Sequence, residues 1–306
     1  MFELQEVWDI KIVLDLFFGG MGAGAFLMGY YLYLKGKKDF GLKVTLSGVI
    51  SLIIGLGILV THLGKPEAAI WAMLTPQLGS VMTWGIFFNV FFMIFGLAFS
   101  GTLILPALPW SKREKDMKML GGLGSLFAFL VMSYTGALLA STSIPIWRSP
   151  ATPLLFILVS ISSGIGLYML LAHLFKQEIE HIAIIASLAT TIGVIVIIVS
   201  MIIIAPVSHV AFKESICMLL GEMATVFYAV PQIAVRESAC VLMGQLAPLF
   251  YLLLFAGILA PLLTLVTMLR GNMEKRWIIT TGLLLILQSL LIRYLIVFSG
   301  VIYLPW

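Results

Sequence analysis

Residues 14–26 read LDLFFGGMGAGAF and place an aspartate, Asp15, directly before a cluster of glycines inside one long apolar run. A carboxylate within the hydrocarbon of a bilayer costs several kcal/mol unless it faces a cavity or a partner, so an acidic residue in such a run indicates a functional site. The glycines allow another helix to approach closely. This run therefore joins a candidate functional residue to a helix-packing surface.

The composition defines the class of protein. Of the 306 residues, 61% are hydrophobic and 10% are charged, which is far from the composition of a soluble domain. Eight apolar runs are each long enough for a bilayer core about 30 Å thick. The sequence predicts an all-α, multi-pass protein of the cytoplasmic membrane, one membrane domain over residues 1–306. The expected spans are about 10–34, 44–62, 81–105, 119–140, 153–173, 182–205, 246–269 and 277–299, with a long outer loop at 206–245.

Lysine and arginine are distributed unevenly between the loops. Counted from the N-terminus, the odd loops hold twelve basic residues and the even loops four. Basic residues concentrate in cytoplasmic loops, so the odd loops are expected in the cytoplasm and both termini outside. Acidic rather than basic residues precede the first span, which we therefore interpret as a retained helix and not a signal peptide. The net charge of +4 reflects this topology and indicates no nucleic-acid partner.

The cysteines and histidines are few. Cys217 and Cys240 both fall in the long outer loop, either as a disulfide or as two unpaired apolar residues. No CxxC or related ligand spacing exists, and the four histidines form no mid-membrane pair, so we expect no iron–sulfur cluster, no haem and no other metal in this chain. The glycine run lacks the GxGxxG pattern and follows no strand, which excludes a dinucleotide site.

Four polar residues from four spans share one depth near the outer surface: Asp15, His62, Tyr134 and Arg293. Each has a structural explanation: Asp15 pairs with Lys11, Arg293 snorkels, and His62 and Tyr134 lie at the interface. Their coincidence in depth favours a pocket instead. An acid, an imidazole and a phenol near one face suit a quinol, whose hydroxyls need a hydrogen-bond acceptor and a proton acceptor as electrons leave.

An aromatic stripe follows one face of the third span. It comprises Trp84, Phe87, Phe88, Phe91, Phe92 and Phe95 at helical spacing. Core packing or lipid contact is one interpretation, and contact with a quinone ring or its isoprenoid tail is the other.

The ordered motifs resemble those of the NrfD/PsrC family of polysulfide reductase-type membrane subunits. The resemblance covers essentially the whole chain. It rests on FGGMGAGAF (18–26), HLGKP (62–66), SVMTWG (80–85), SYTG (133–136) with PIW (145–147), Ser163-Gly164 and the Arg293 region.

The resemblance implies eight helices in two four-helix bundles, with no redox cofactor of the chain's own. It implies a quinone or menaquinone site near the outer face, where Tyr134 resembles the family's quinone-contacting tyrosine and Asp15 occupies the polar position before the first-span glycines. Together with the depth of the polar residues, this predicts a site held by Asp15, Gly19, Gly22, His62, Trp84, Tyr134 and Arg293, among which Asp15, His62 and Tyr134 would be catalytic. The implied partners on the outer side are a four-cluster ferredoxin-like iron–sulfur subunit and a molybdopterin or multihaem catalytic subunit. Some members carry Asn and His in the first helix where this chain has Asp15, so the hydrogen bonds to the quinone are expected to differ.

Two other functions remain open from the sequence. A secondary transporter would place its site at the midplane on broken helices, and Pro248 and Pro261 in the seventh run are candidate breaks. A purely structural membrane anchor with a vestigial site is the third interpretation.

The charge bias generates a topology prediction. A cysteine introduced near Lys37 or Lys115 should resist membrane-impermeant thiol reagents in intact cells, whereas one near Lys65 should react, because twelve of the sixteen loop cations are expected in the cytoplasm. The measurement is labelling before and after permeabilisation. Labelling in the opposite sense would overturn the orientation.

Overall fold

The computed structural model describes residues 2–5, 8–62, 74–77, 79–205, 208, 210–221, 223, 244–271 and 273–303. Within these ranges, eight helical stretches are long and apolar enough to cross a membrane. The predicted all-α integral membrane protein is therefore confirmed.

The helices follow in the order of the chain. They are α1 (Ile10–Leu34), α2 (Lys38–His62), α4 (Val81–Ser100) with the 3₁₀ turn η1 (Gly101–Leu103), α5 (Glu114–Ala140), α6 (Ala151–Leu174), α7 (His181–Ile204), α8 (Val210–Leu220), α10 (Ala247–Leu252), the π-helical η4 (Leu253–Leu259), α11 (Ala260–Leu269) and α12 (Lys275–Phe298).

Two helices begin earlier than the hydropathy predicted. Helix α2 begins at Lys38 instead of residue 44, and α5 begins at Glu114 instead of residue 119. The added first turns are polar and carry ion pairs one turn apart, Lys43 with Asp39 at 2.7 Å and Lys118 with Glu114 at 3.1 Å. Such pairs stabilise helix in water, so these helices extend past the hydrocarbon.

The seventh span is continuous but irregular. It passes from α10 through the π-helical η4 into α11, which has Pro261 in its first turn. Proline has no N–H to donate to the preceding turn, and the widened π-helical turn directly precedes it. Proline therefore changes the helical winding here and does not divide the span.

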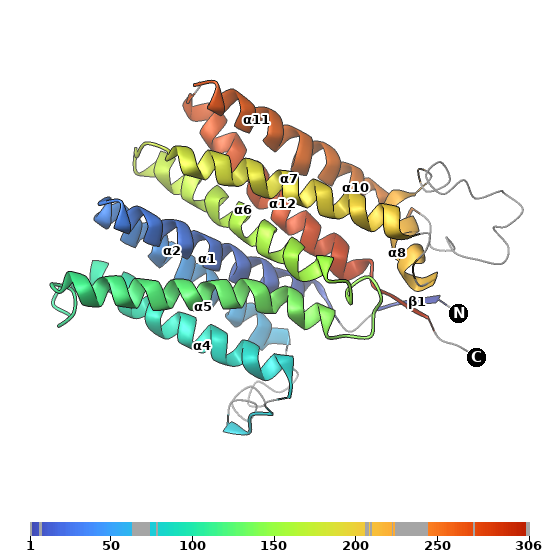
Figure 1. The fold of residues 1–306 in the computed structure, drawn as a ribbon, viewed down its shortest axis with the longest axis horizontal. Coiled ribbons are helices and arrows are strands. Elements are labelled where there is room, and N and C mark those ends of the chain that lie inside the picture. Colours follow the sequence, from blue (N-terminus) through green and yellow to red (C-terminus); the bar gives the residue numbers. More distant parts are fainter. Residues whose placement is uncertain are drawn as a thin grey trace, which may run out of the picture.

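The helices form two groups of four, as Figure 1 shows. One group contains α1, α2, α4 and α5, and the other contains α6, α7, α12 and the α10–α11 span. Helices α1 and α6 pack against each other where the groups meet. This arrangement agrees with the predicted pair of four-helix bundles.

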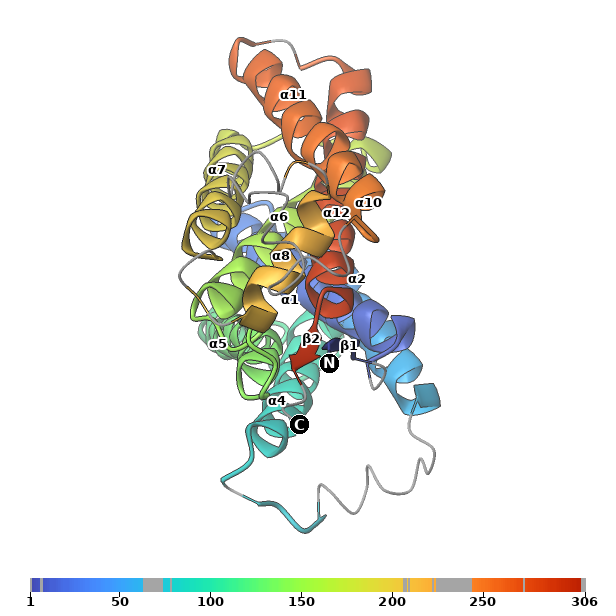
Figure 2. The ribbon, with the colours of Figure 1, turned by 90° about the vertical axis from the view of Figure 1, so that its right-hand side faces the viewer.

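Both chain ends lie at one end of the molecule, which we call the terminal end (Figures 1 and 2). Strands β1 (Phe2–Leu4) and β2 (Val301–Tyr303) pair there as an antiparallel ladder in which Phe2 opposes Tyr303. The sequence analysis predicted no strand. Two three-residue segments so far apart in the chain carry no local signal of pairing.

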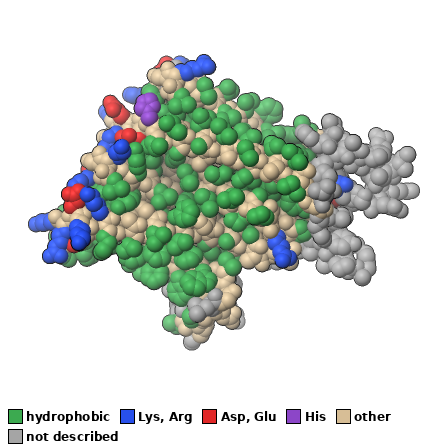
Figure 3. All heavy atoms as spheres, in the orientation of Figure 1, with side chains coloured by type: hydrophobic (Ala, Val, Ile, Leu, Met, Phe, Trp, Pro, Cys, Tyr) green, Lys and Arg blue, Asp and Glu red, His purple; other side chains and the backbone are tan. Residues whose placement is uncertain are grey.

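Charged side chains gather at the end opposite the termini (Figure 3). The odd loops meet there, and ion pairs join them, as between Lys37 and Glu180 at 2.7 Å and between Lys38 and Glu114 at 3.8 Å. The basic residues that were counted separately along the sequence thus form one surface. That this surface is cytoplasmic stays a prediction.

The glycines of α1 pack on two sides of that helix. Toward α2, Gly22 lies so close to Gly48 that a Cβ atom on Gly22 would collide with the Gly48 carbonyl oxygen. Toward α6, a Cβ atom on Gly24 would collide with the carbonyl oxygen of Ser160, and Gly164 lies directly against Gly24. The predicted glycine packing surface therefore serves both helix groups.

The long loop predicted at 206–245 begins with a buried helix, α8. Cys217 on α8 is buried and disulfide-bonded, which corrects the alternative of two unpaired cysteines. Cys240 lies outside the described residues.

A substitution can test the contact between α1 and α6. We expect Gly24→Val to lower the free energy of unfolding by at least about 1–3 kcal/mol, the usual cost of overpacking, because its side chain meets rigid backbone. Gly57→Val is the matched control, since a Cβ atom on Gly57 of α2 meets nothing within 4 Å. The measurement is thermal unfolding in detergent. Equal unfolding temperatures for the two variants would contradict the packing.

Candidate functional site

Asp15 lies in the second turn of α1, against Gly55 of α2. A Cβ atom on Gly55 would come within 3.3 Å of the Asp15 Oδ1 atom, so the glycine leaves room for the carboxylate between the two helices. The Lys11 ammonium donates to the carbonyl oxygen of Thr61 at 3.2 Å, which corrects the alternative that Lys11 pairs with Asp15. Among the described residues, none forms a hydrogen bond or ion pair with the Asp15 carboxylate.

Tyr134 of α5 approaches Asp15 from another helix. Its ring lies flush against Gly85 of α4, where a Cβ atom would collide with the ring. The Tyr134 phenol lies within electrostatic range of the Asp15 carboxylate. Within the described part of the chain, the Tyr134 hydroxyl has no hydrogen-bond partner.

The pair of Asp15 and Tyr134 thus has unused hydrogen-bonding capacity. A carboxylate accepts hydrogen bonds, and a phenol both donates and accepts. Both residues are half-buried in the bundle and have no hydrogen-bond partner among the described residues, so both groups are free to bind a polar ligand. We call Asp15 and Tyr134 the acid–phenol site.

His62 lies apart from the acid–phenol site, nearer the terminal end. Its Nδ1 atom is 3.2 Å from Oδ2 of Asp9. His62 is seven residues beyond Gly55 along α2, an axial distance of about 10 Å at 1.5 Å per residue. The predicted grouping of His62 with Asp15 and Tyr134 is therefore corrected: antiparallel α1 and α2 pair His62 with Asp9 and place Asp15 beside Gly55.

Asp9 is the neighbour of His62. In the sequence it is one of the acidic residues that precede the first span. It caps α1 by accepting the backbone N–H groups of Lys11 at 2.9 Å and Ile12 at 3.3 Å. Slight burial by itself would raise the pKa of Asp9, but the hydrogen bonds from Ile12, His62 and Lys11 together hold this pKa below its usual value of 3.8.

Arg293 of α12 is fully buried between α1, α6 and α12. Its Nη2 atom donates to Ser160 Oγ at 2.7 Å, its Nη1 atom donates to the Ser289 hydroxyl, and its guanidinium lies 5.3 Å from the ring centroid of Phe156. The Nε atom has no partner among the described residues. The snorkelling interpretation is therefore wrong, because the guanidinium does not reach the surface.

Gly20 makes room for this guanidinium on α1, since a Cβ atom there would collide with Arg293 Nη2. Asp15 and Gly20 are five residues apart, which at 100° per residue puts them about 140° apart around α1. Arg293 and Asp15 consequently lie on different sides of α1. The sequence predicted one pocket that contains Asp15 and Arg293. In the structure, α1 separates the Asp15 carboxylate from the Arg293 guanidinium.

The other predicted binding residues have packing contacts. Gly19 faces Leu52, and Gly22 faces Gly48, both on α2. Trp84 is 45% exposed and lies against Phe87 and Phe88 of its own helix.

Part of the aromatic stripe also has a packing role. Phe91 and Phe95 stack on Phe127 of α5 with ring centroids 5.0 and 5.6 Å apart. The stripe therefore packs helices together and also faces the lipid. Of the motif at 62–66, residues 63–66 lie outside the described residues.

The structure also identifies residues that the sequence reasoning did not select. Gly55 and Gly85 accommodate the acid–phenol site, and Ser160 and Ser289 bind the guanidinium of Arg293. Small residues are common in membrane helices. Their part in a site depends on which helix lies opposite, which no local pattern in the sequence shows.

These features define a class: a multi-pass helical membrane protein with a polar site inside one bundle, below its terminal end. The chain belongs to the NrfD family, described as "Polysulphide reductase, NrfD", whose family model matches residues 3–305.

Curated relatives share part of this sequence. A selenate reductase subunit of Mesobacillus selenatarsenatis is 27% identical over 205 residues, which cover 55% of this chain and 48% of that protein. Protein NrfD of Escherichia coli is 29% identical over 198 residues, covering 57% of this chain and 62% of the relative. The matched regions thus span between about half and three fifths of these relatives.

The capping contact of Asp9 predicts a pH dependence. A carboxyl whose pKa is lowered by folding stabilises the protein above its unfolded pKa, near 3.8, and loses this contribution as the pH falls through the lower folded value. We expect Asp9→Ala to lower the unfolding temperature near neutral pH. The difference in unfolding temperature between this variant and the unsubstituted protein should shrink as the pH falls below 3.8 toward the folded pKa of Asp9.

The measurement is thermal unfolding in detergent from about pH 6 to about pH 3. Asp9→Asn is the matched control, because asparagine retains the helix cap without the charge. A difference between Asp9→Ala and the unsubstituted protein that stays constant across this range would contradict the role of the charge.

Proposed function

We propose that this protein is the membrane subunit of a respiratory oxidoreductase complex and that it oxidises quinol, or reduces quinone, at the acid–phenol site. The observation that carries the proposal is that a carboxylate and a phenol, Asp15 and Tyr134, lie within electrostatic range of each other inside a membrane bundle. Neither side chain has a hydrogen-bond partner among the described residues. Membership of the NrfD family supports it.

The chemistry of a quinol matches these two groups. Oxidation of a quinol releases two electrons and two protons, so it needs a proton acceptor beside one hydroxyl and a hydrogen-bonding group that orients the other oxygen. In this proposal Asp15 accepts the two protons one after the other, releasing the first before it takes the second, and the two electrons pass to the iron–sulfur partner subunit. The Tyr134 hydroxyl binds the second oxygen of menaquinol or a related quinol. Quinone reduction is the same sequence reversed, with two electrons arriving from the partner and Asp15 delivering two protons in turn.

The Asp9–His62 pair gives the proton a route. It lies between Asp15 and the terminal end, and an imidazole has one ring nitrogen that can accept a proton and another that can donate one. We propose that a proton accepted by Asp15 leaves past His62 toward the surface at that end. The exposed ring of Trp84, next to the glycine that accommodates Tyr134, offers a surface for the isoprenoid tail.

Arg293 has a different part in this proposal. Its guanidinium supplies a fixed positive charge on the far side of α1, where it lowers the energy of negative charge that develops within the bundle. Gly19 and Gly22 set the distance between α1 and α2 on which the shape of the site depends.

The electrons require partners. One relative is named as a subunit of a selenate reductase, which supports a complex with separate catalytic subunits for this chain as well. We propose an iron–sulfur subunit of the four-cluster ferredoxin type at the terminal end, passing electrons to or from a molybdopterin or multihaem subunit.

The competing functions have less support. A secondary transporter built from repeated halves would place matching interruptions in two helices, and among the described helices the π-helical segment in the seventh span has no counterpart. A purely structural anchor does not account for Asp15, because an unpaired carboxylate within the membrane raises the free energy of the folded protein.

Substitution of the two site residues tests the proposal. Asp15→Asn should slow quinol oxidation by about 10²–10⁴-fold, the usual effect of removing a positioned base. Tyr134→Phe should weaken quinol binding by about 0.5–1.5 kcal/mol through loss of one hydrogen bond. The measurement uses a water-soluble quinol analogue with the intact complex.

Three controls accompany this experiment. Activity with an artificial donor that bypasses the membrane subunit should survive both substitutions. Asp39→Asn and Tyr30→Phe, which alter the same residue types near the opposite end of the helices, should keep quinol turnover. Wild-type quinol turnover in both Asp15→Asn and Tyr134→Phe would refute the acid–phenol site.

A further inference from the structure

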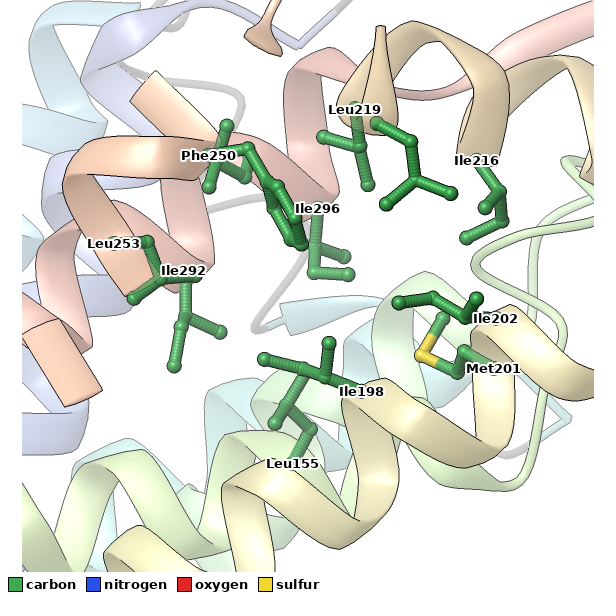
Figure 4. Close-up of a pocket in the computed structure, with 12 residues that line it drawn as sticks. Leu155, Ile198, Met201, Ile202, Ile216, Leu219, Phe250, Leu253, Ile292 and Ile296 are labelled. Atoms are coloured by element: carbon green, nitrogen blue, oxygen red, sulfur yellow. The ribbon is translucent and has the colours of Figure 1, made fainter. Parts of the chain in front are cut away.

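A small hollow lies in the second group of helices, away from the acid–phenol site; the space between its lining atoms, counted together with the part that is open to the surroundings, is about 430 Å³. It is enclosed by α6, α7, α8, α12 and the first half of the seventh span, and it is partly open to its surroundings (Figure 4). Leu155 reaches it from α6, Ile198 and Ile202 from α7, Ile216 from α8 and Ile296 from α12. The quinol chemistry proposed above makes no use of this space.

The lining determines what the hollow can hold. All twelve lining residues are leucine, isoleucine, phenylalanine or methionine, and none carries a charged or hydrogen-bonding side chain. A water molecule in a protein interior needs two to four polar partners, so this lining does not favour water. A matching occupant is hydrocarbon.

The position of the hollow relates it to the bilayer. Ile198 and Ile202 precede the end of α7 at Ile204 by six and two residues, which puts them about 9 and 3 Å below that end. Leu155 is four residues inside α6, or about 6 Å. The hollow is therefore level with the start of the acyl chains in the leaflet at the terminal end.

The side of α7 that faces away from the hollow is exposed and apolar. Val199 and Ile203, which alternate with the lining residues of α7, are 46% and 69% exposed. One face of α7 is thus available to lipid while its other face lines the hollow. Only this one helix separates the hollow from the outer surface at that side.

Two basic residues belong to segments that adjoin the lining residues of the hollow in sequence. Lys213 is one turn before Ile216 on α8, and Arg148 follows Trp147, which packs in one hydrophobic cluster with Leu155 and Ile296. These are two of only four basic residues in the even loops, and the other two lie outside the described residues. A cation above an apolar hollow suits an anionic headgroup above a hydrocarbon chain.

We propose that this hollow binds one acyl chain of a membrane phospholipid, with the lipid phosphate at the level of Lys213 and Arg148. The bound chain fills the space between α7 and α12 and joins the disulfide-bonded helix α8 to the spans beneath it. This lipid site is separate from the quinol site, because Asp15 and Tyr134 belong to the other group of helices.

A pair of adjacent substitutions tests the site. Ile202→Trp fills the hollow from α7, whereas Ile203→Trp places the same side chain on the lipid-facing side. The purified protein is washed in detergent, and retained phospholipid and quinone are counted by mass spectrometry. We expect Ile202→Trp to lose about one tightly bound phospholipid per chain relative to both other proteins.

Equal phospholipid retention in all three proteins would overturn the proposal. Loss of quinone without loss of phospholipid would also overturn it, because the occupant would then be an isoprenoid tail.

A measurement on the unsubstituted protein covers the case in which Ile202→Trp fails to fold. The protein is reconstituted with phosphatidylglycerol that carries a photoactivatable diazirine in the upper part of one acyl chain, and labelled peptides are mapped after illumination. Label on Ile198, Ile202 and Ile216 supports the site. Label confined to outward residues such as Val199 and Ile203 overturns it.

Discussion

The backbone contacts of α1 with α2 and α6 are the constraint on which the rest of the structure depends. Gly22 with Gly48 on one side, and Gly24 with Ser160 and Gly164 on the other, bring the helices closer than side chains would permit. In a membrane, apolar surface on its own does not drive helices together, so close packing of small residues carries much of their association. Helix α1 thereby joins the two groups of four helices.

The same contacts decide where polar groups can be buried. Gly55 leaves space for the Asp15 carboxylate on one side of α1, and Gly20 leaves space for the Arg293 guanidinium on another. Each charged residue lies where a glycine on the facing helix provides room, and neither has an oppositely charged partner among the described residues. An unpaired charge inside a membrane protein is costly, so a contribution to stability does not explain either position.

Most of the fold could be predicted from the sequence, because hydropathy reports directly on the bilayer. The eight spans, the grouping of charged loops at one end and the glycine contacts of α1 all appear in the structure. Predicted helix ends were too short where ion pairs continue a helix into water, as at Lys43 and Asp39. Pro261 indicated an irregularity in the seventh span, but its form as a π-helical turn within a continuous span was not evident from the sequence. The β1–β2 ladder had no usable local signal.

The sequence by itself determined the class of protein and the set of polar residues beneath one surface, because each charged residue in an apolar run is evident without coordinates. Only the tertiary structure decided which of these residues meet. Depth along a helix follows from counting residues, whereas the direction around the helix depends on which neighbour packs there. Asp15 therefore lies within electrostatic range of Tyr134, His62 pairs with Asp9, and Arg293 lies across α1.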